Sequence, residues 1–354
     1  MPQPTLTDRF ADTALLLVWH VVRVVGDILL NPASTLSIGS LACALVIAAA
    51  WLSRRHVANG LAIPLRPLCR LLFPRGWLAS RSSRLDFELL LLNTFVFGVL
   101  LGGALLSARF VSTEVQGLLV AVLGAPGPSR LSDGVATVLL TVAIFLAYEL
   151  AYWVQHYLSH TVPFLWEMHK VHHSAEVLTP LTNSRVHPIE SIMLLNMIAL
   201  FIGVTEGVVL YALGHSASQL TLAGVNAMVV VGTYLVAHLH HTHVWIAFTG
   251  RLGAVFVSPA HHQVHHSTNP IHFNKNLGSV LAIWDWLFGT LHVPARTRER
   301  LSFGLGDQDA TEHTVAQELF RPVRAIGAGL LLGDTAMRGT GRDTTTAREI
   351  AGKS

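Results

Sequence analysis

Apolar residues run through the chain in long, nearly continuous stretches. Five of these stretches have about the 20 residues that a helix needs to cross the hydrocarbon core of a bilayer. They lie at residues 35–52, 86–106, 133–155, 191–213 and 217–239. A sixth stretch, 10–31, is interrupted by Arg23 and Asp27, so that it either spans the membrane or lies in its surface as an amphipathic helix.

The composition supports a membrane protein. Of the 354 residues, 51% are hydrophobic and only 13% are charged, which excludes an ordinary soluble domain of this length. The two cysteines, Cys43 and Cys69, have no CxxC neighbour, so neither a disulfide framework nor a cluster site is expected. The N-terminus lacks the basic region of a signal peptide, and we expect the first apolar segments to be retained. The pattern therefore predicts an all-α, polytopic membrane helical bundle.

Arginine gives this bundle a predicted orientation. The segment 53–84 contains seven arginines and no acidic residue. The positive-inside rule places such a segment on the cytoplasmic side. Counting spans from there brings the histidine-rich segments at 156–173 and 238–266 to the same side. No aromatic interleaving or binding motif accompanies the arginines, so nucleic acid is not an expected partner.

Histidines gather at the ends of the predicted spans. Three short stretches contain them: HYLSH (His156, His160), HKVHH (His169, His172, His173) and HQVHH (His262, His265, His266). Spacings of three and four residues place side chains on one face of a helix. Ser258 and Pro259 provide an N-cap and a first helical residue for the last stretch, and Pro163 separates the first two.

Metal binding explains this pattern better than chance. With 20 histidines in 354 residues, H-x-x-H-H is expected about 0.06 times, and it occurs twice. A proton relay would place histidines and carboxylates across a span, whereas these lie at span ends. Imidazole ligands suit iron, zinc, copper or nickel, and eight or more histidines exceed the needs of one ion. Two ions fit the count; a histidine-lined metal transporter and a b-type cytochrome with axial histidines are the alternatives.

The order of these motifs resembles that of a known family. HxxxH, HxxHH, a transmembrane hairpin and then HxxHH are similar to the fatty acid hydroxylase and sterol desaturase superfamily of integral-membrane di-iron oxygenases. NSRVHPIE (183–190), NLGSVLAIWDWLFGTL (276–291) and FGLGDQD (303–309) also resemble elements of this superfamily. The resemblance covers about residues 133–310, as a catalytic domain. It leaves 1–132 as an N-terminal transmembrane or interfacial region and 311–354 as a C-terminal segment with a disordered tail.

The resemblance also implies a set of ligands. Carried over by position, the boxes assign His156, His160, His169, His172, His173, His262, His265 and His266 to the metal, in a histidine-rich di-metal cap on the cytoplasmic side. A further family histidine falls in AHLHHTHVWI (237–246), which offers His238, His240, His241 and His243, and we expect His238 and His241 to be ligands. Glu190, His261 and Asp285 are expected to contact the ligands and orient them, and His187 either does the same or serves as a structural cap. Glu149, Glu167 and Glu176 either orient ligands or are surface charges.

The resemblance implies a membrane-bound oxidoreductase with two iron ions. Such an enzyme uses O₂ to hydroxylate or desaturate a C–H bond of a lipid, which could be a sterol, a fatty acyl chain or a related molecule. Each turnover needs two electrons, so a separate donor, a ferredoxin or a cytochrome with its reductase, is expected. A transporter would instead hold its ligands near the middle of broken spans. Most of the histidines here lie outside the apolar segments.

Overall fold

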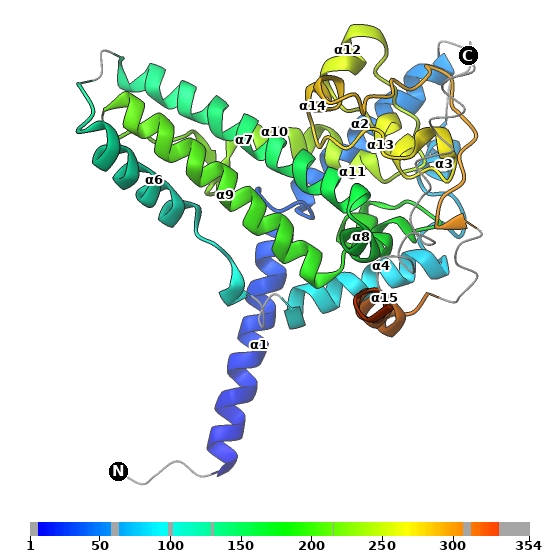
Figure 1. Cartoon of the computed structure of the whole chain (residues 1–354). Coiled ribbons are helices and arrows are strands. Elements are labelled where there is room, and N and C mark those ends of the chain that lie inside the picture. Colours follow the sequence, from blue (N-terminus) through cyan, green and yellow to red (C-terminus); the bar gives the residue numbers. More distant parts are fainter. Residues whose placement is uncertain are drawn as a thin grey trace.

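The computed structural model describes residues 6–57, 64–97, 102–128, 131–214, 216–306 and 313–332. Almost all regular structure in these residues is helical, which confirms the all-α prediction (Figure 1). The exception is a two-stranded antiparallel hairpin of β1 (Thr221–Leu222) and β2 (Val225–Asn226). His215 and the C-terminal residues 333–354, including the tail predicted to be disordered, lie outside the described residues.

The helices follow one another with short connections. The first half contains α1 (Leu6–Leu30), α2 (Ile38–Val57), α3 (Leu65–Leu72), α4 (Arg81–Leu92), η1 (Asn93–Phe97), η2 (Gly102–Ala104), α6 (Ala108–Leu123) and α7 (Asp133–Thr161). The second half contains α8 (Pro163–His173), η3 (Pro180–Ser184), α9 (Pro188–Leu213), α10 (Ala227–Gly232), η4 (Thr233–Ala237), α11 (His238–His240), α12 (Gly250–Val255), α13 (Pro259–His265), η5 (Pro270–His272), α14 (Ile283–Leu287) and α15 (Val315–Leu332).

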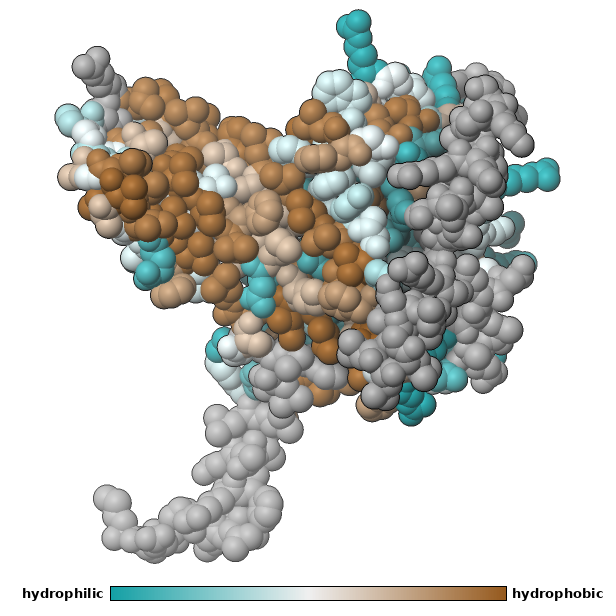
Figure 2. All heavy atoms as spheres, in the orientation of Figure 1, coloured by the Kyte–Doolittle hydropathy of each residue, from teal (hydrophilic) through white to brown (hydrophobic). Residues whose placement is uncertain are grey.

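Three of the described helices, α2, α7 and α9, are long and apolar enough to cross a membrane. They confirm the predicted helices at 35–52, 133–155 and 191–213. The outer surface of α7 and α9 is apolar, and Figure 2 shows hydrophobic side chains gathered over them and over α6. A soluble protein would not expose such a continuous apolar surface. α1 is also a helix and projects away from the rest of the chain in Figure 1, but it is not one of the three candidate spans.

The segment 107–132, which lies between two of the predicted spans, contains the helix α6. Its N-cap Ser107 accepts a hydrogen bond from the backbone N–H of Phe110. α6 packs against α9, where glycine allows close approach. A Cβ atom at Gly203 would lie 2.5 Å from the carbonyl oxygen of Ala108, and one at Gly207 would lie 2.8 Å from that of Ser112. α6, α7 and α9 thus form an apolar layer beside the histidine-bearing part of the chain (Figure 1).

Two predicted spans are not continuous α-helices in the described residues. In 86–106 the α-helix α4 ends at Leu92 and the π-helix η1 continues to Phe97, whereas residues 98–101 lie outside the described residues. Polar contacts hold α4 and η1 to the chain around residue 185. Asp86 is paired with the buried Arg185, and the side-chain amide of Asn93 donates to the Val186 carbonyl. The stretch 217–239 begins with the β1–β2 hairpin and becomes helical only at Ala227. Its turn uses Gly224 at φ +82°, a conformation that a helix does not contain.

Candidate metal centre

Three helices bring the histidine motifs together: the end of the long helix α7 and the short helices α8 and α13. α7 ends at Thr161, and Pro163 starts α8 at its first position, as the sequence predicted. Ser258 caps α13 and Pro259 begins it, also as predicted, and α13 contains the last motif. Because α7, α8 and α13 meet, their histidines lie close together in the interior, although His156 and His265 are 109 positions apart in the chain.

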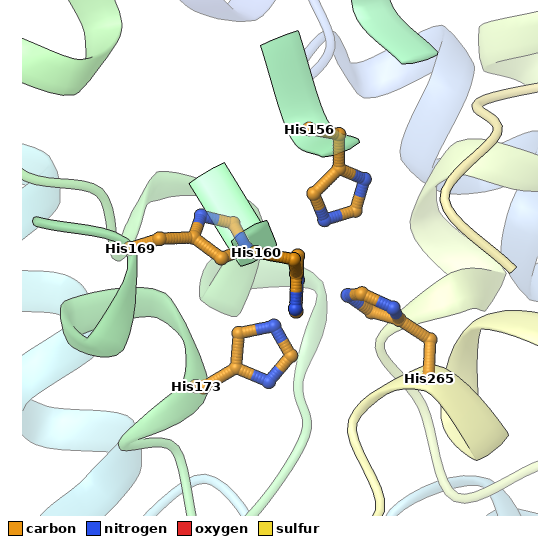
Figure 3. A group of neighbouring side chains, drawn as sticks. All are labelled: His156, His160, His169, His173 and His265. Carbon is orange, nitrogen blue, oxygen red and sulfur yellow. The ribbon is translucent and has the colours of Figure 1, made fainter. Parts of the chain in front are cut away.

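The histidines form two separate groups. The first histidine group consists of His156, His160, His169, His173 and His265. The second histidine group consists of His172, His241, His262 and His266. Within each group, one ring nitrogen of every member lies within 4.8 Å of those of all others, and every member is buried. Figure 3 shows the five rings of the first group converging from different elements.

Each H-x-x-H-H motif is divided between the two groups. In α8, His169 and His173 belong to the first group, whereas His172 belongs to the second. In α13 the assignment is reversed: His262 and His266 belong to the second group and His265 to the first. The i and i+4 residues therefore share one group while the i+3 residue reaches the other. The two groups are adjacent, since the ring centroids of His173 and His266 are 4.5 Å apart.

The second group has the geometry of a coordination shell. The Nε2 atom of His241 lies 3.2 Å from that of His172, 3.1 Å from that of His266 and 2.9 Å from that of His262. A neutral imidazole has one N–H, so these nitrogens cannot all satisfy one another by hydrogen bonds. Nitrogens bound to one ion at about 2.0–2.1 Å would lie about 3 Å apart, and so the observed geometry fits a metal ion.

Burial keeps these rings neutral, as metal ligands must be. Burial lowers the pKa of His172 to about 3. The pKa values of His173 and His265 fall well below the usual range, because of burial first and neighbouring histidines second. Those of His241, His262 and His266 are lowered in the same way. Neutral imidazoles expose the lone pair that a cation needs.

In the first group, hydrogen bonds made by the ring nitrogen Nδ1 fix the orientation of the rings. His156 donates from Nδ1 to the Leu277 carbonyl at 2.8 Å, and His265 donates from Nδ1 to the Lys275 carbonyl at 2.9 Å. Their Nε2 atoms are buried and have no hydrogen-bond partner among the described residues. Such an arrangement leaves Nε2 as the free ligand atom. His169 Nδ1 is paired with the carboxylate of Glu190, which was expected to support a ligand.

Two buried carboxylates hold the chain segment that contains Leu277. Asp285 accepts hydrogen bonds from the backbone N–H groups of Leu277 and Gly278, and Glu149 accepts from those of Val280 and Leu281. Asp285 therefore acts on His156 through the backbone, more remotely than the sequence suggested. Glu149, which the sequence left undecided, has the same indirect role.

Nine of the ten histidines predicted as ligands lie in the two groups, and His238 does not. His238 was expected to join His241 because both would lie on one helical face. α11 ends at His240, and His241 adopts φ −102° and ψ 63°, which turns it away from that face. His238 instead contacts Ser40 Oγ through Nε2 at 3.0 Å.

The remaining candidates have structural contacts. His261 accepts from Ser258 in the capping box of α13 and donates to the Gly253 carbonyl, so it does not contact the groups as expected of a supporting residue. His187 caps α9 and accepts from the backbone N–H of Ile189, one of the two roles considered for it. His240 stacks on His262, and His243 donates to the Leu71 carbonyl at 2.6 Å.

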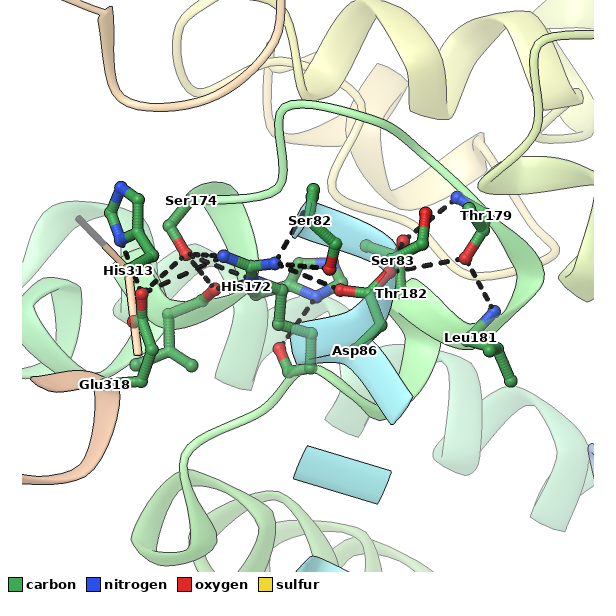
Figure 4. A network of polar contacts seen from close by, with 12 residues as sticks. Ser82, Ser83, Asp86, His172, Ser174, Thr179, Leu181, Thr182, His313 and Glu318 are labelled. Carbon is green, nitrogen blue, oxygen red and sulfur yellow. Dashed lines mark hydrogen bonds and ion pairs between the residues drawn. The ribbon is translucent and has the colours of Figure 1, made fainter. Parts of the chain in front are cut away.

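The sequence did not reveal the role of Arg185, which is 1% exposed. Its guanidinium pairs with Asp86 at 3.1 Å and donates to the Val171 carbonyl and to Ser174 Oγ. Asp86 and Ser174 are labelled in the polar network of Figure 4. The Arg185 carbonyl in turn accepts from His172 Nδ1 at 3.3 Å. The available signal was the position of Arg185 two residues before His187 in NSRVHPIE.

A third, smaller cluster lies nearer the surface. It consists of His272, His292 and Glu299. His272 Nε2 lies 3.6 Å from the Glu299 carboxylate, an ion-pair contact when the ring is protonated. Only His272 of this cluster is buried, in contrast to the nine histidines of the two groups.

Known proteins are similar in sequence to the part of the chain that contains the two histidine groups. The model of the fatty acid hydroxylase family matches residues 141–290. Alkylglycerol monooxygenases from Danio rerio and Homo sapiens are 29% and 30% identical over 164 residues, which is 46% of this chain and 32% of each relative. The ornithine lipid hydroxylase OlsE of Rhizobium tropici is 31% identical over 150 residues, 42% of this chain and 40% of that protein.

These matches cover less than half of each relative's length. No solved structure matches the chain. The matched region begins within α7 and ends just after α14, so it contains all nine histidines of the two groups. Residues 141–290 of this chain are therefore similar to the fatty acid hydroxylase family and to enzymes named as lipid hydroxylases.

Proposed function

We propose that this chain is a membrane-bound lipid hydroxylase with two iron ions, one held by each histidine group. The observation that carries the proposal is the division of both H-x-x-H-H motifs between two buried groups. One ion would need only part of this set, whereas two adjacent ions use all nine histidines. The relatives named as a monooxygenase and a lipid hydroxylase support hydroxylation rather than desaturation.

The bound iron supplies the redox chemistry that activates O₂ for attack on a C–H bond. In the balanced reaction, one oxygen atom enters the C–H bond to give an alcohol, and the other leaves as water. Two electrons and two protons complete it, and we propose a separate ferredoxin or cytochrome as the electron donor. The chain itself orients its imidazoles through the Leu277 and Lys275 carbonyls and Glu190. Burial of the groups excludes bulk water from them.

The test is a reconstitution of the purified chain with iron, a chemical reductant and a membrane lipid extract. We expect about two iron ions per chain, O₂ uptake that depends on lipid, and products heavier by one oxygen atom. Products lighter by two hydrogens would instead show desaturation. Metal binding with no lipid-dependent O₂ uptake, together with metal flux into vesicles, would establish the transporter and overturn the proposal.

We also propose that the histidine groups face the cytoplasm. The arginine-rich segment 53–84 contacts the histidine-bearing part, since Trp77 Nε1 donates to the Leu178 carbonyl and His243 donates to the Leu71 carbonyl. Cys69 is exposed in α3 and serves as a natural reporter. In a Cys43→Ser background, a membrane-impermeant thiol reagent should label Cys69 only in inverted vesicles. A second variant, Cys43→Ser/Cys69→Ser/Ile271→Cys, shows on which side of the membrane the segment after α13 lies. Labelling of either cysteine from outside intact cells would overturn the proposed cytoplasmic orientation.

A further inference from the structure

The third cluster, which consists of His272, His292 and Glu299, lies outside both histidine groups. His272 is the last residue of η5, whereas His292 and Glu299 follow α14. Residues 288–303, which contain the latter two, form no helix or strand. A segment of this length without regular structure is uncommon in a compact domain and usually has a function. Through the contacts of His272 with His292 and Glu299, the cluster links this segment to the chain just after α13.

His272 is buried without the partners that a buried imidazole needs. The residue is 2% exposed, and its Nδ1 atom has no hydrogen-bond partner among the described residues. Its Nε2 atom lies 3.6 Å from a carboxylate oxygen of Glu299, which is too long for a hydrogen bond. Buried polar groups are normally hydrogen-bonded, so the ring of His272 has capacity for a ligand.

The cluster has the spacing of a metal site. One ligand atom of each member lies within 4.8 Å of those of the other two. Tetrahedral bonds of about 2.0–2.1 Å would place ligand atoms about 3.3 Å apart, and octahedral bonds of similar length about 3.0 Å apart. The 3.6 Å between His272 Nε2 and Glu299 is nearer to the tetrahedral value. The ring centroids of His272 and His292 are 5.0 Å apart, similar to the 5.1 Å between His156 and His160 in the first group.

An ion pair alone explains this cluster less well than a metal ion does. The pair would require a protonated His272, but burial lowers the pKa of this ring. If His292 were also protonated, two cations would lie side by side. A divalent cation removes both difficulties, because it binds neutral imidazoles and offsets the charge of Glu299.

We propose that His272, His292 and Glu299 bind one zinc ion, separate from the two ions of the histidine groups. Two imidazoles and one carboxylate provide three ligands, and water fills the fourth position of a tetrahedral site. Water can reach this position, since Glu299 is 28% exposed and His292 is half-buried. The ion takes no part in the oxidation of a lipid, and this inference does not rest on the proposed hydroxylase function.

The role of the zinc ion is to hold the segment that orients the first histidine group. The backbone N–H of Lys275 donates to the His272 carbonyl at 3.3 Å, and the Lys275 carbonyl accepts from His265 Nδ1. On the other side, the backbone N–H of His292 donates to Asn276 Oδ1 at 2.7 Å. An ion bound between His272 and His292 therefore fixes both ends of the contacts around residues 275 and 276.

Metal analysis of the purified full-length chain, produced with both iron and zinc present, tests this site. The wild type should contain about three metal ions per chain, including at least one zinc ion. His292→Ala and Glu299→Gln should each contain about two, whichever metal occupies the histidine groups. In chelator competition, zinc at this site should be bound about 100-fold more weakly in either variant. His292→Cys should retain the third ion, because a thiolate is also a zinc ligand.

His56→Ala is the matched control for loss of a histidine. His56 is half-buried in α2, its Nδ1 atom contacts the Leu52 carbonyl, and it lies outside the third cluster and both histidine groups. It should contain as much metal as the wild type. Equal metal content in the wild type, His292→Ala and Glu299→Gln would overturn the inference, as would iron in place of zinc as the ion that these two variants lose.

Limited trypsin digestion provides a second measurement that does not depend on counting ions. Arg296, Arg298 and Arg300 are exposed in the segment that the ion would hold. Zinc added to chelator-treated protein should slow cleavage at these arginines about tenfold in the wild type, and should not slow it in Glu299→Gln. An equal response of the two proteins to zinc would overturn the inference. A chain that binds zinc here but oxidises no lipid would contradict only the hydroxylase function.

Discussion

The two histidine groups are built from the same motifs but are supported differently. In the first group, His156, His169 and His265 are each held from behind by a carbonyl or a carboxylate. In the second, only the contact from His172 to the Arg185 carbonyl is of this kind, and it is longer at 3.3 Å. The Nδ1 atoms of its three other members, His241, His262 and His266, are buried and have no partner among the described residues.

This difference implies unequal metal affinity. Hydrogen bonds to the second ring nitrogen fix its tautomer and raise its basicity, and removing one such partner typically costs 10- to 100-fold in affinity. The first group should therefore hold its ion more tightly than the second. Two sites with the same type of ligand would then differ in metal affinity because of the surrounding backbone. Here that backbone is the segment 275–281, which accepts hydrogen bonds from ligand histidines and is held in place by Asp285 and Glu149.

Removing one ring from either group should have the largest effect. We expect His173→Ala to lose the ion of the first group and His266→Ala that of the second, so that each variant retains about one iron per chain. Activity should be abolished in both, because the proposed chemistry needs both ions. Metal analysis and O₂ uptake at matched membrane levels measure this. If both variants kept two ions and turnover, the division into two groups would have no functional meaning.

Arg185→Met should disturb the second group while largely sparing the first. The substitution leaves Asp86 buried without its partner, and breaking such a pair costs about 3–5 kcal/mol. It also frees the chain segment that provides the carbonyl for His172. A lowered thermal unfolding temperature and selective loss of one ion are expected. Arg84→Met, which removes a nearby exposed charge, is the control; equal effects of the two would contradict a specific role.

Glu190→Gln should reduce the difference in metal affinity between the first and the second histidine group. The side chain keeps its shape but loses the charge that faces His169. We expect a 10- to 100-fold decrease in affinity at the first group, measured by chelator competition. The wild type should release its ions in two phases and Glu190→Gln in phases that are closer together. Two unchanged phases would show that Glu190 does not support the bound metal.

Periodic features of the sequence were sufficient for much of this site. The i, i+3 and i+4 spacings predicted the shared helical faces, and Ser258, Pro259 and Pro163 predicted where α13 and α8 begin. These signals are local, so they hold whatever the rest of the chain does. The division of each motif between two groups could not be predicted, because it depends on how α7, α8 and α13 meet.

Hydropathy was less reliable where polar residues interrupt a long stretch. It located α2, α7 and α9, but it did not reveal that the α-helix α4 changes to the π-helix η1 at Asn93, in a segment where Asp86 and Asn93 contact residues 185–186. It also extended a span backwards from Ala227 across the β1–β2 turn. In both cases tertiary hydrogen bonds, which a window average does not contain, decide the structure. The same reason explains His238, whose assignment assumed a helix that ends at His240.

The smallest effect is expected for His243→Ala, which tests the crowded segment 238–243. His243 lies outside both groups, donates to the Leu71 carbonyl and packs edge-on against Trp77. Its loss should cost about 1 kcal/mol of stability and leave both ions and turnover in place. His241→Ala, two residues away, removes the ring whose Nε2 contacts three others and should lose the ion of the second group. Iron analysis of the pair measures the contrast. The reverse result, an ion lost from His243→Ala and retained in His241→Ala, would mean that the chain turns at His241 differently and that the second group contains a different ring.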